Sequence, residues 1–166
     1  MNTDISLEMQ VLTEQIEILA PHLMVWAALE DFGGVSDWAP YMNRSKLVGS
    51  KQTGVGTRRI MHHDLGFNFE EMVTHWVDGE GYSFDVYRAP YPMINVHETW
   101  STEHKNGLST VSTQVNYGMR LGAIGRLLDW ALVRFIVRRE MRAGLRGLKQ
   151  HVEREAEKAS ALQYAD

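Results

Sequence analysis

The sequence contains no cysteine among its 166 residues. This absence excludes disulfide bonds, thiolate zinc sites and cysteine nucleophiles, and it fits a reducing compartment. A chain of this length can bury a sufficient core without cross-links. We therefore expect a cytoplasmic protein with a single domain over residues 1–166.

Long apolar runs are also missing. The most apolar region is interrupted by Arg126, Asp129 and Arg134, so no stretch approaches the ~18 apolar residues of a membrane-spanning helix. The first residues include Asp4 and lack the basic start of a secretory signal. We expect no signal peptide and no stable membrane insertion.

Positive charge is not in excess, because 17 Lys and Arg face 21 Asp and Glu for a net charge of -4. Such a chain repels a phosphate backbone on average, and its sequence carries no zinc-finger, helix-turn-helix or ribonucleoprotein signature. We therefore expect no nucleic-acid partner.

The sequence does contain an ordered series of secondary-structure signals. Alternating residues predict a first strand over 9–18, and Pro21 precedes a helical segment over 22–29. A second short helix over 35–38 ends at Pro40. Turn residues then separate six predicted strands, over 44–49, 57–63, 67–76, 82–88, 94–102 and 108–117. A change to helical periodicity predicts one long helix over 123–157.

Several short motifs in this order resemble a known superfamily. They are Ala20-Pro21, Val25-Trp26, Asp31-Phe32, Trp38-Ala39-Pro40, Gly54-Val55-Gly56-Thr57, Glu71-Met72-Val73, Tyr82-Ser83-Phe84 and Leu145-Arg146-Gly147-Leu148. Over residues 9–152 the chain is similar to the START-like (SRPBCC) superfamily, which includes polyketide cyclase/dehydrase-like proteins and lipid-transfer domains. The resemblance implies an α+β helix-grip fold, in which a seven-stranded curved antiparallel sheet wraps around a long C-terminal helix. It also implies two short helices between strands 1 and 2, and a ligand cavity between sheet and helix.

Strand parity indicates which side chains line such a cavity, because successive residues alternate between the two faces of a sheet. The inward sets are Phe67, Phe69, Glu71, Val73 and His75; Tyr82, Phe84 and Val86; Ile94, Val96, Glu98 and Trp100; and Val111, Thr113, Val115 and Tyr117. Most of these side chains are apolar. They predict a closed apolar cavity for a small organic ligand.

Two carboxylates, Glu71 and Glu98, fall on this inward face. Arg59, in phase with Thr57 and Met61 on the preceding strand, is a candidate partner for Glu71. An unpaired buried carboxylate has a raised pKa, which suits an acid/base catalyst or a ligand anchor. Two other interpretations remain open: pairing with arginine, or a one-residue register slip that turns both carboxylates toward water.

Histidine is frequent, but its spacing does not suit metal binding. His62 and His63 are adjacent and so point to opposite faces of a strand, and no His-x-x-x-His or His-x-His pair occurs. We expect no metal and no cofactor. His75 shares the phase of Glu71 and is either an acid/base candidate or an exposed residue at a strand end. The catalytic candidates are therefore Glu71, Glu98 and His75.

The long helix carries two apolar stripes. The first is Ile124, Leu127, Leu128, Ala131, Leu132 and Phe135, and the second, turned by a quarter circle or more, is Val137, Met141, Leu145, Leu148 and Val152. The first face continues as Arg138, Arg139, Arg142, Arg146 and Lys149. A bend within 136–141 would bury both stripes, including Phe135 and Leu145. Alternatively, Leu128, Leu132 and Phe135 form a lid over the cavity, or the exposed apolar and basic face makes transient contact with an anionic membrane or a partner. The bend is the favoured interpretation.

Two functions are consistent with these sequence features. The first is binding or transfer of an apolar small molecule, such as a lipid, an isoprenoid or a polyketide-like compound. The second is a polyketide cyclase/dehydratase-type enzyme that uses a cavity carboxylate or histidine as acid/base. The sequence lacks a convincing closely spaced acid/base pair, which favours the binder. The ligand-binding candidates are Arg59, Phe69, Glu71, Tyr82, Phe84, Val96, Glu98, Trp100, Val115, Tyr117, Leu128, Leu132 and Phe135.

Overall fold

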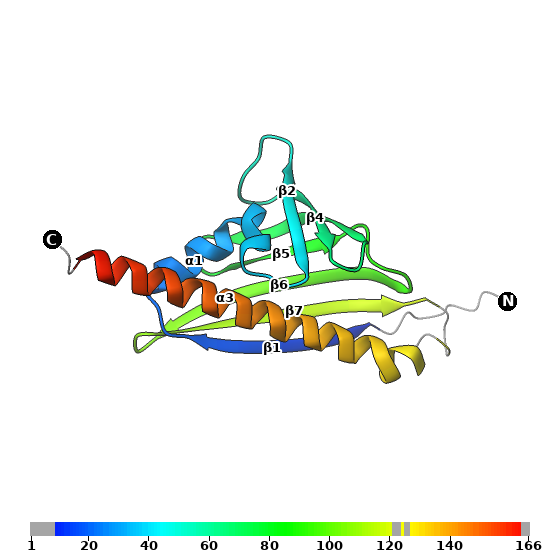
Figure 1. Cartoon of the computed structure of the whole chain (residues 1–166). Helices are drawn as coiled ribbons and strands as arrows, with labels where there is room; N and C mark the ends of the chain where they lie inside the picture. The colour runs from blue at the N-terminus through cyan, green and yellow to red at the C-terminus, as the bar shows by residue number, and fades with distance from the viewer. Residues whose placement is uncertain (1–8, 121–123, 125–126, 164–166) are drawn as a thin grey trace.

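A computed structural model describes residues 9–120, 124 and 127–163 of the chain. It contains a seven-stranded antiparallel sheet with the order β1-β7-β6-β5-β4-β3-β2 (Figure 1). The strands are β1 (Gln10–Ile18), β2 (Met42–Val48), β3 (Arg58–His63), β4 (Asn68–Val77), β5 (Gly81–Val86), β6 (Met93–Lys105) and β7 (Leu108–Met119). The helices are α1 (His22–Glu30), the 3-10 helix η1 (Phe32–Asp37), the π-helical turn η2 (Asp129–Val133) and α3 (Arg134–Gln163). The predicted helix-grip architecture is confirmed.

The sheet and the C-terminal helix enclose the interior. α3 runs the length of the sheet beside β1 and β7, and α1 lies against its C-terminal half (Figure 1). One core cluster joins α1, η1 and the central strands to the middle of α3, through buried Phe32, Tyr82, Leu145 and Leu148. A Cβ on Gly147 would lie 1.8 Å from the carbonyl oxygen of Trp38. Glycine at this position is therefore what allows α3 to approach the end of η1 so closely.

Register shifts interrupt the strict alternation of faces in three strand pairs, and two of these shifts move residues that were expected to face the cavity. The β4–β5 pairing shifts between Val73 and His75, and the β6–β7 pairing shifts between Ile94 and His97. Each bulge adds one residue and so exchanges the faces beyond it. As a result His75 is exposed and Trp76 packs against the core. The expectation that His75 faces inward is therefore wrong.

The long helix is irregular at its start and not in its middle. The π-helical turn Asp129–Val133 precedes α3, which continues without interruption through residues 136–141. Leu145 is 2% exposed, but Phe135 is 67% exposed. The predicted burial of Phe135 is wrong, and no break occurs within 136–141, because the second apolar stripe packs against the sheet while Leu132 and Phe135 of the first stripe are exposed.

Polar side chains of α3 attach it to the edge strand β1. Arg138 and Arg142 donate to the two carboxylate oxygens of Glu14, at 3.1 and 2.8 Å. Lys149 donates to the backbone carbonyl of Glu17 and to the Glu153 carboxylate, at 2.7 and 2.6 Å. These contacts cover one edge of the open sheet. None of the described helices combines the length and the apolar character needed to cross a membrane.

Candidate functional site: a cavity between the sheet and the C-terminal helix

A cavity of about 330 Å³ lies between the inner face of the sheet and α3. This volume is at the lower end of the range of roughly 300 to 1,000 Å³ that small-molecule sites occupy. Strands β3 to β7 supply one wall, and residues 133–144 of the helical segment supply the opposite wall. The lining is mostly apolar, with Met61, Phe69, Tyr82, Phe84, Val96, Trp100 and Val115 on the strand side.

The cavity opens to solvent. Leu65, Tyr91 and Ile136 line it and are 77%, 68% and 40% exposed. They come from the β3–β4 turn, the β5–β6 loop and the first turn of α3, so the mouth lies at one end of the sheet. The expectation of a closed cavity is therefore wrong. The large side chains Leu132 and Phe135 point into solvent and do not close the mouth.

A buried ion pair stands on the strand wall. Arg59 and Glu71 are directly opposite each other on β3 and β4, and Arg59 Nε donates to Glu71 Oε2 at 2.6 Å. Arg59 Nη1 also donates to the carbonyl oxygen of Phe32 at 2.7 Å, and its guanidinium lies 3.8 Å from the centre of the Phe32 ring. Burial raises the pKa of Glu71, while the positive charge of Arg59 opposes this shift. The predicted inward position of both residues is confirmed.

The second inward carboxylate, Glu98 on β6, has a different environment. Glu98 Oε1 accepts hydrogen bonds from Trp100 Nε1 at 2.6 Å and from Thr113 Oγ1 at 3.1 Å. Burial, reinforced by the negative charge of Glu71, raises the pKa of Glu98 to about 7, although both hydrogen bonds oppose this shift. Near neutral pH this carboxyl group can therefore donate a proton or accept one.

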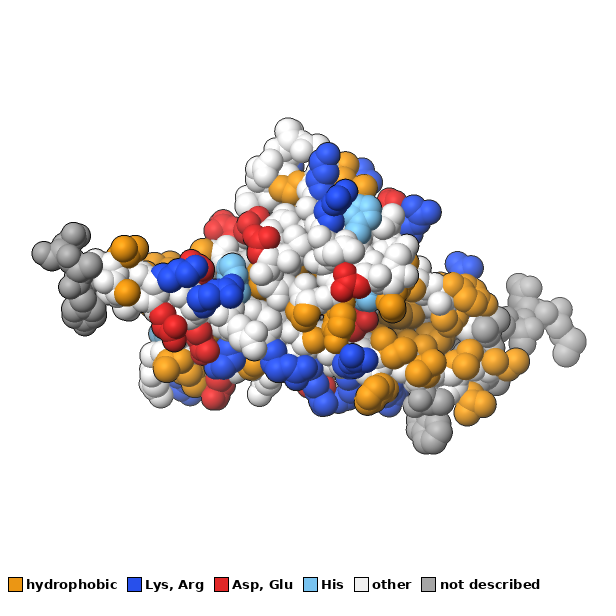
Figure 2. All heavy atoms as spheres, viewed as in Figure 1, with side chains coloured by type: hydrophobic (Ala, Val, Ile, Leu, Met, Phe, Trp, Pro, Cys, Tyr) orange, Lys and Arg blue, Asp and Glu red, His pale blue; other side chains and the backbone are white. Residues whose placement is uncertain are grey.

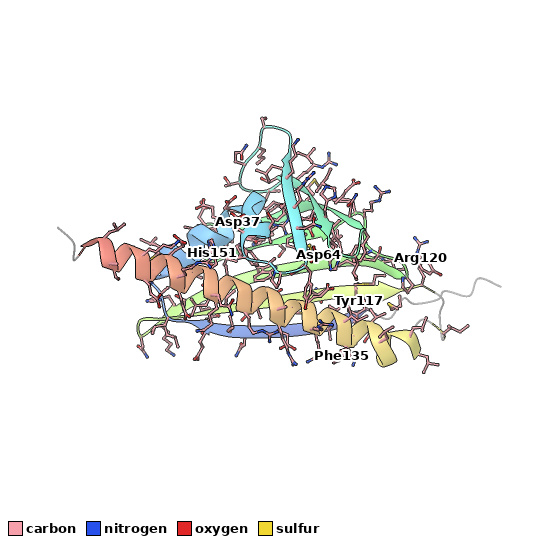
Figure 3. The ribbon with its side chains drawn as sticks, viewed as in Figure 1. Asp37, Asp64, Tyr117, Arg120, Phe135 and His151 are labelled. Atoms are coloured by element: carbon pink, nitrogen blue, oxygen red, sulfur yellow. The ribbon has the colours of Figure 1, made fainter. Side chains whose placement is uncertain are left out.

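Nine of the thirteen predicted ligand-binding residues line the cavity: Arg59, Phe69, Glu71, Tyr82, Phe84, Val96, Glu98, Trp100 and Val115. Tyr117 is buried but does not line it, because its hydroxyl donates to the buried carboxylate of Asp129 at the start of η2. Leu128, Leu132 and Phe135 do not line it either, and Figure 3 shows Phe135 on the side of the helix that faces away from the sheet. Their expected place over the cavity is wrong, since the first stripe points outward.

Other lining residues were not found from the sequence. They are Val133, Val137, Glu140, Met141 and Gly144 of the helix, and Tyr41, Met93 and others from loops and strand ends. Met93 replaces Ile94 because of the bulge on β6. Glu140 lies 3.2 Å from Nε2 of buried His63. The second apolar stripe contained a usable signal, because Glu140 and Gly144 lie one helical turn from its members Val137 and Met141.

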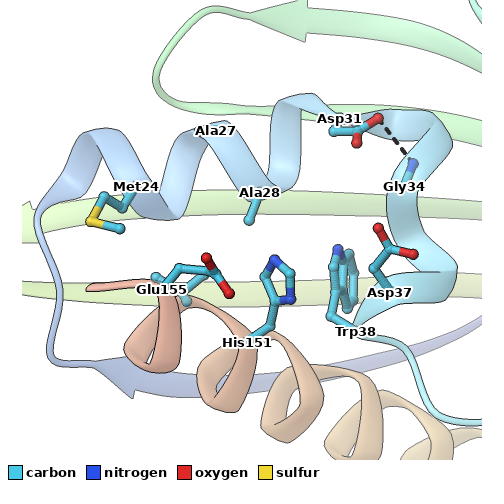
Figure 4. Close-up of a pocket in the computed structure, with 10 residues that line it drawn as sticks. Met24, Ala27, Ala28, Asp31, Gly34, Asp37, Trp38, His151 and Glu155 are labelled. Carbon is cyan, nitrogen blue, oxygen red and sulfur yellow. Dashed lines mark hydrogen bonds between the residues drawn. The ribbon is translucent and has the colours of Figure 1, made fainter. Parts of the chain in front are cut away.

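A smaller hollow of about 260 Å³ lies between α1, η1 and α3. Figure 4 shows His151 and Glu155 of α3 opposite Met24 and Ala28 of α1. It is separate from the main cavity except at Trp38, which lines both. Within the part of the chain that the structure describes, no group of three His, Asp or Glu is placed to hold a metal ion. The mostly apolar cavity between the sheet and α3 is therefore the candidate site.

Comparison with known families and structures fits this geometry. The sequence model of the family described as "Polyketide cyclase / dehydrase and lipid transport" matches residues 9–153. No curated protein matches the chain in sequence.

Three solved structures illustrate the structural likeness. An uncharacterized protein from Bacillus thuringiensis has 21% identity and a TM-score of 0.71, over 86% of this chain and 98% of that one. The Zhui aromatase/cyclase of a Streptomyces species has 15% identity and a TM-score of 0.74, over 89% of this chain and 95% of that one. Ara h 8.0201 has 14% identity and a TM-score of 0.69, over 87% of this chain and 98% of that one. At these identities the likeness establishes the fold alone.

Proposed function

Because the chain belongs to the polyketide cyclase/dehydrase and lipid transport family of the START-like (SRPBCC) superfamily, we propose that it binds an apolar small molecule in its internal cavity. The observation that carries the proposal is the cavity itself. It has about 330 Å³ of mostly apolar space that reaches the surface, with the polar groups Arg59, Glu71 and Glu98 on its strand wall. Ligand sites commonly combine apolar walls with a few convergent polar groups.

The walls supply most of the affinity, and Glu98 orients the ligand. An apolar molecule that loses about 200 Å² of accessible surface gains about 5 kcal/mol from burial before the cost of association. Arg59 is already bonded to Glu71 and to the Phe32 carbonyl. Glu98 uses only one oxygen for its two described hydrogen bonds. When protonated it can donate to a carbonyl group, and when ionised it can accept from a hydroxyl group. A lipid, isoprenoid or polyketide-like molecule with one such group fits this wall.

A cavity-blocking variant tests the proposal. An uncharged, environment-sensitive naphthalene dye should bind one molecule per chain and be displaced by apolar ketones. A Cβ on Gly144 would lie 3.8 Å from the Trp100 ring, which is an ordinary contact, so a longer side chain there enters the cavity. Gly144→Leu should weaken dye binding about tenfold or more by occupying this space. Ala159→Leu, on the exposed end of the same helix, is the matched control. Undiminished binding by a folded Gly144→Leu protein would overturn the proposal.

A second candidate function is acid/base catalysis in the same cavity, and the observation that favours it is the Glu98 pKa of about 7. An acid or base works best when its pKa lies near the working pH. The carboxylate would remove a proton from the carbon beside a ligand carbonyl, and the carboxyl group would return it to carbon or to oxygen. Tetralone in D2O is a direct probe, because exchange of its α-protons is visible by NMR. Wild type should accelerate the exchange and Glu98→Gln should not. Equal exchange by the two proteins at equal dye affinity leaves binding as the sole function.

A further inference from the structure

One end of the molecule carries an exposed apolar surface. We name as the apolar tip the side chains of Ile124, Leu127, Leu128, Leu132, Phe135 and Ile136, which are between 40% and 67% exposed. Figure 2 shows hydrophobic side chains gathered at the end of the molecule where α3 begins. Soluble proteins rarely expose a contiguous apolar patch of this kind unless it meets another surface.

The apolar tip adjoins the mouth of the cavity. Ile136 belongs to both, since it is exposed and lines the cavity. Leu65 and Tyr91, on the opposite rim, line the same cavity and are also exposed. An apolar surface placed against the tip would therefore also meet the entrance, and a ligand could pass between them without crossing water.

Arginines lie beside the apolar tip. Arg134, Arg138, Arg139 and Arg142 lie among or after its residues along α3, and Arg120 lies just after β7 at the same end of the molecule (Figure 3). The backbone N–H of Arg120 donates to the Pro92 carbonyl on the rim of the mouth, and its side chain has no ion pair among the residues that the structure describes.

The nearby acids offset these arginines only in part. Arg138 and Arg142 share the single carboxylate of Glu14. Asp129 accepts from Tyr117 and also forms an ion pair with Arg134 at 3.7 Å. Glu140 faces His63, so three described carboxylates, Glu14, Asp129 and Glu140, stand against the five arginines. Positive charge is therefore in local excess at the tip, although the whole chain carries a net charge of -4.

From the exposed apolar tip and the excess of arginine beside it, we propose that the tip docks on the surface of an anionic lipid bilayer. The apolar side chains enter the boundary between headgroups and acyl chains, and the arginines lie at the level of the lipid phosphates. In this orientation the cavity mouth faces the lipid. A second copy of the chain is a poorer occupant, because pairing two tips would bring like-charged arginines together. The inference does not depend on which molecule the cavity holds.

Sedimentation with lipid vesicles tests the proposal on the full chain. Phosphatidylcholine vesicles containing about 30% phosphatidylglycerol should bind the protein, and vesicles of phosphatidylcholine alone should bind it about tenfold more weakly. Binding should also weaken as salt is raised, because screening removes the electrostatic attraction. Equal binding to both kinds of vesicle would contradict the role of the arginines.

Two variant pairs locate the contact. Phe135→Asp should lower vesicle binding about tenfold or more, whereas Leu162→Asp, at the opposite end of α3 and 71% exposed, should not. Arg120→Glu should also weaken binding, unlike Arg154→Glu near that opposite end. Dye binding in the cavity should survive all four changes. Loss of vesicle binding can therefore be distinguished from loss of ligand binding in the cavity. A concentration-dependent dimer in light scattering that Phe135→Asp abolishes, without vesicle binding by wild type, would assign the tip to a second copy and overturn the proposal.

Discussion

Arg59 and Glu71 form an ion pair 2.6 Å long whose two side chains are each 3% exposed, although both belong to the wall of a cavity that opens to solvent. The arginine is also held by the Phe32 carbonyl and ring. These contacts fix the pair to η1 as well as to the sheet. The pair therefore stabilises the cavity wall, in addition to any contact that it makes with a ligand.

The first prediction concerns removal of one charge from this pair. Glu71→Gln should lower the free energy of unfolding by about 3 kcal/mol, because it leaves the buried Arg59 without its counter-charge. It should also change ligand affinity. Glu70→Gln is the matched control, since the Glu70 side chain is half-buried on the opposite face and its one described ion pair is with exposed Arg88 at 3.3 Å. Its effect in urea denaturation should stay within about 0.5 kcal/mol. Equal losses at the two positions would contradict the role assigned to the pair.

The second prediction is a pH dependence that originates at Glu98. In the folded protein Glu98 keeps its proton up to about pH 7, whereas its ordinary pKa is 4.5. The folded state therefore binds more protons than the unfolded state between these values, and stability falls as pH rises through this window. The loss attributable to Glu98 is about 2 to 3 kcal/mol, and Glu98→Gln should abolish it.

Parallel urea titrations at pH 4.5 and pH 7.5 check this dependence. Because other groups also titrate, the informative quantity is the difference between wild type and Glu98→Gln at each pH. A difference that stays constant across the window would mean that Glu98 titrates at its ordinary value.

The third prediction contrasts two glycines of α3. A Cβ on Gly144 meets nothing closer than 3.8 Å, whereas a Cβ on Gly147 would lie 1.8 Å from the Trp38 carbonyl oxygen. Gly144→Ala should therefore raise stability by up to about 1 kcal/mol through helix propensity. Gly147→Ala should lower the melting temperature, because the helix must move away from η1. If both variants melted at the wild-type temperature, the close approach of α3 to η1 would not exist.

The fourth prediction separates the two apolar stripes of the helix. Leu145→Ala should cost about 2 to 5 kcal/mol, because it leaves a cavity in the core. Phe135→Ala should cost less than about 0.5 kcal/mol, because Phe135 is 67% exposed. Thermal denaturation of the two variants checks this difference in stability. A large loss for Phe135→Ala would show that the first stripe is buried in solution.

The sequence was sufficient to predict the order of the elements and the inward face of most strands. Glu71, Phe84 and Val115 were placed correctly because alternation holds wherever a strand pairs without interruption. His75 was misplaced because a bulge adds a residue without any change in the hydrophobic pattern that precedes it. Apolar periodicity reports which residues share a face, but it does not report where an extra residue enters.

The outward position of the first apolar stripe of the helix cannot be predicted from the sequence for a related reason. Its first stripe is apolar and regularly spaced, which is also what a core-facing stripe looks like. Spacing alone cannot distinguish a face that packs on the sheet from one that meets another surface. Only the position of Leu132 and Phe135 relative to the sheet, which the fold determines, shows that they point outward.

The π-helical turn Asp129–Val133 has a consequence for how the two sides of this helix can evolve. In an uninterrupted α-helix, a one-residue insertion rotates everything beyond it by about 100°, so a gain on one side is a loss on the other. A π turn absorbs one extra residue locally. Asp129, bonded to Tyr117 of β7, anchors the turn to the sheet. An insertion among the outer side chains before the turn, such as Leu127 and Leu128, can therefore be absorbed there without rotating the cavity-facing side chains Val137 and Met141 that follow it.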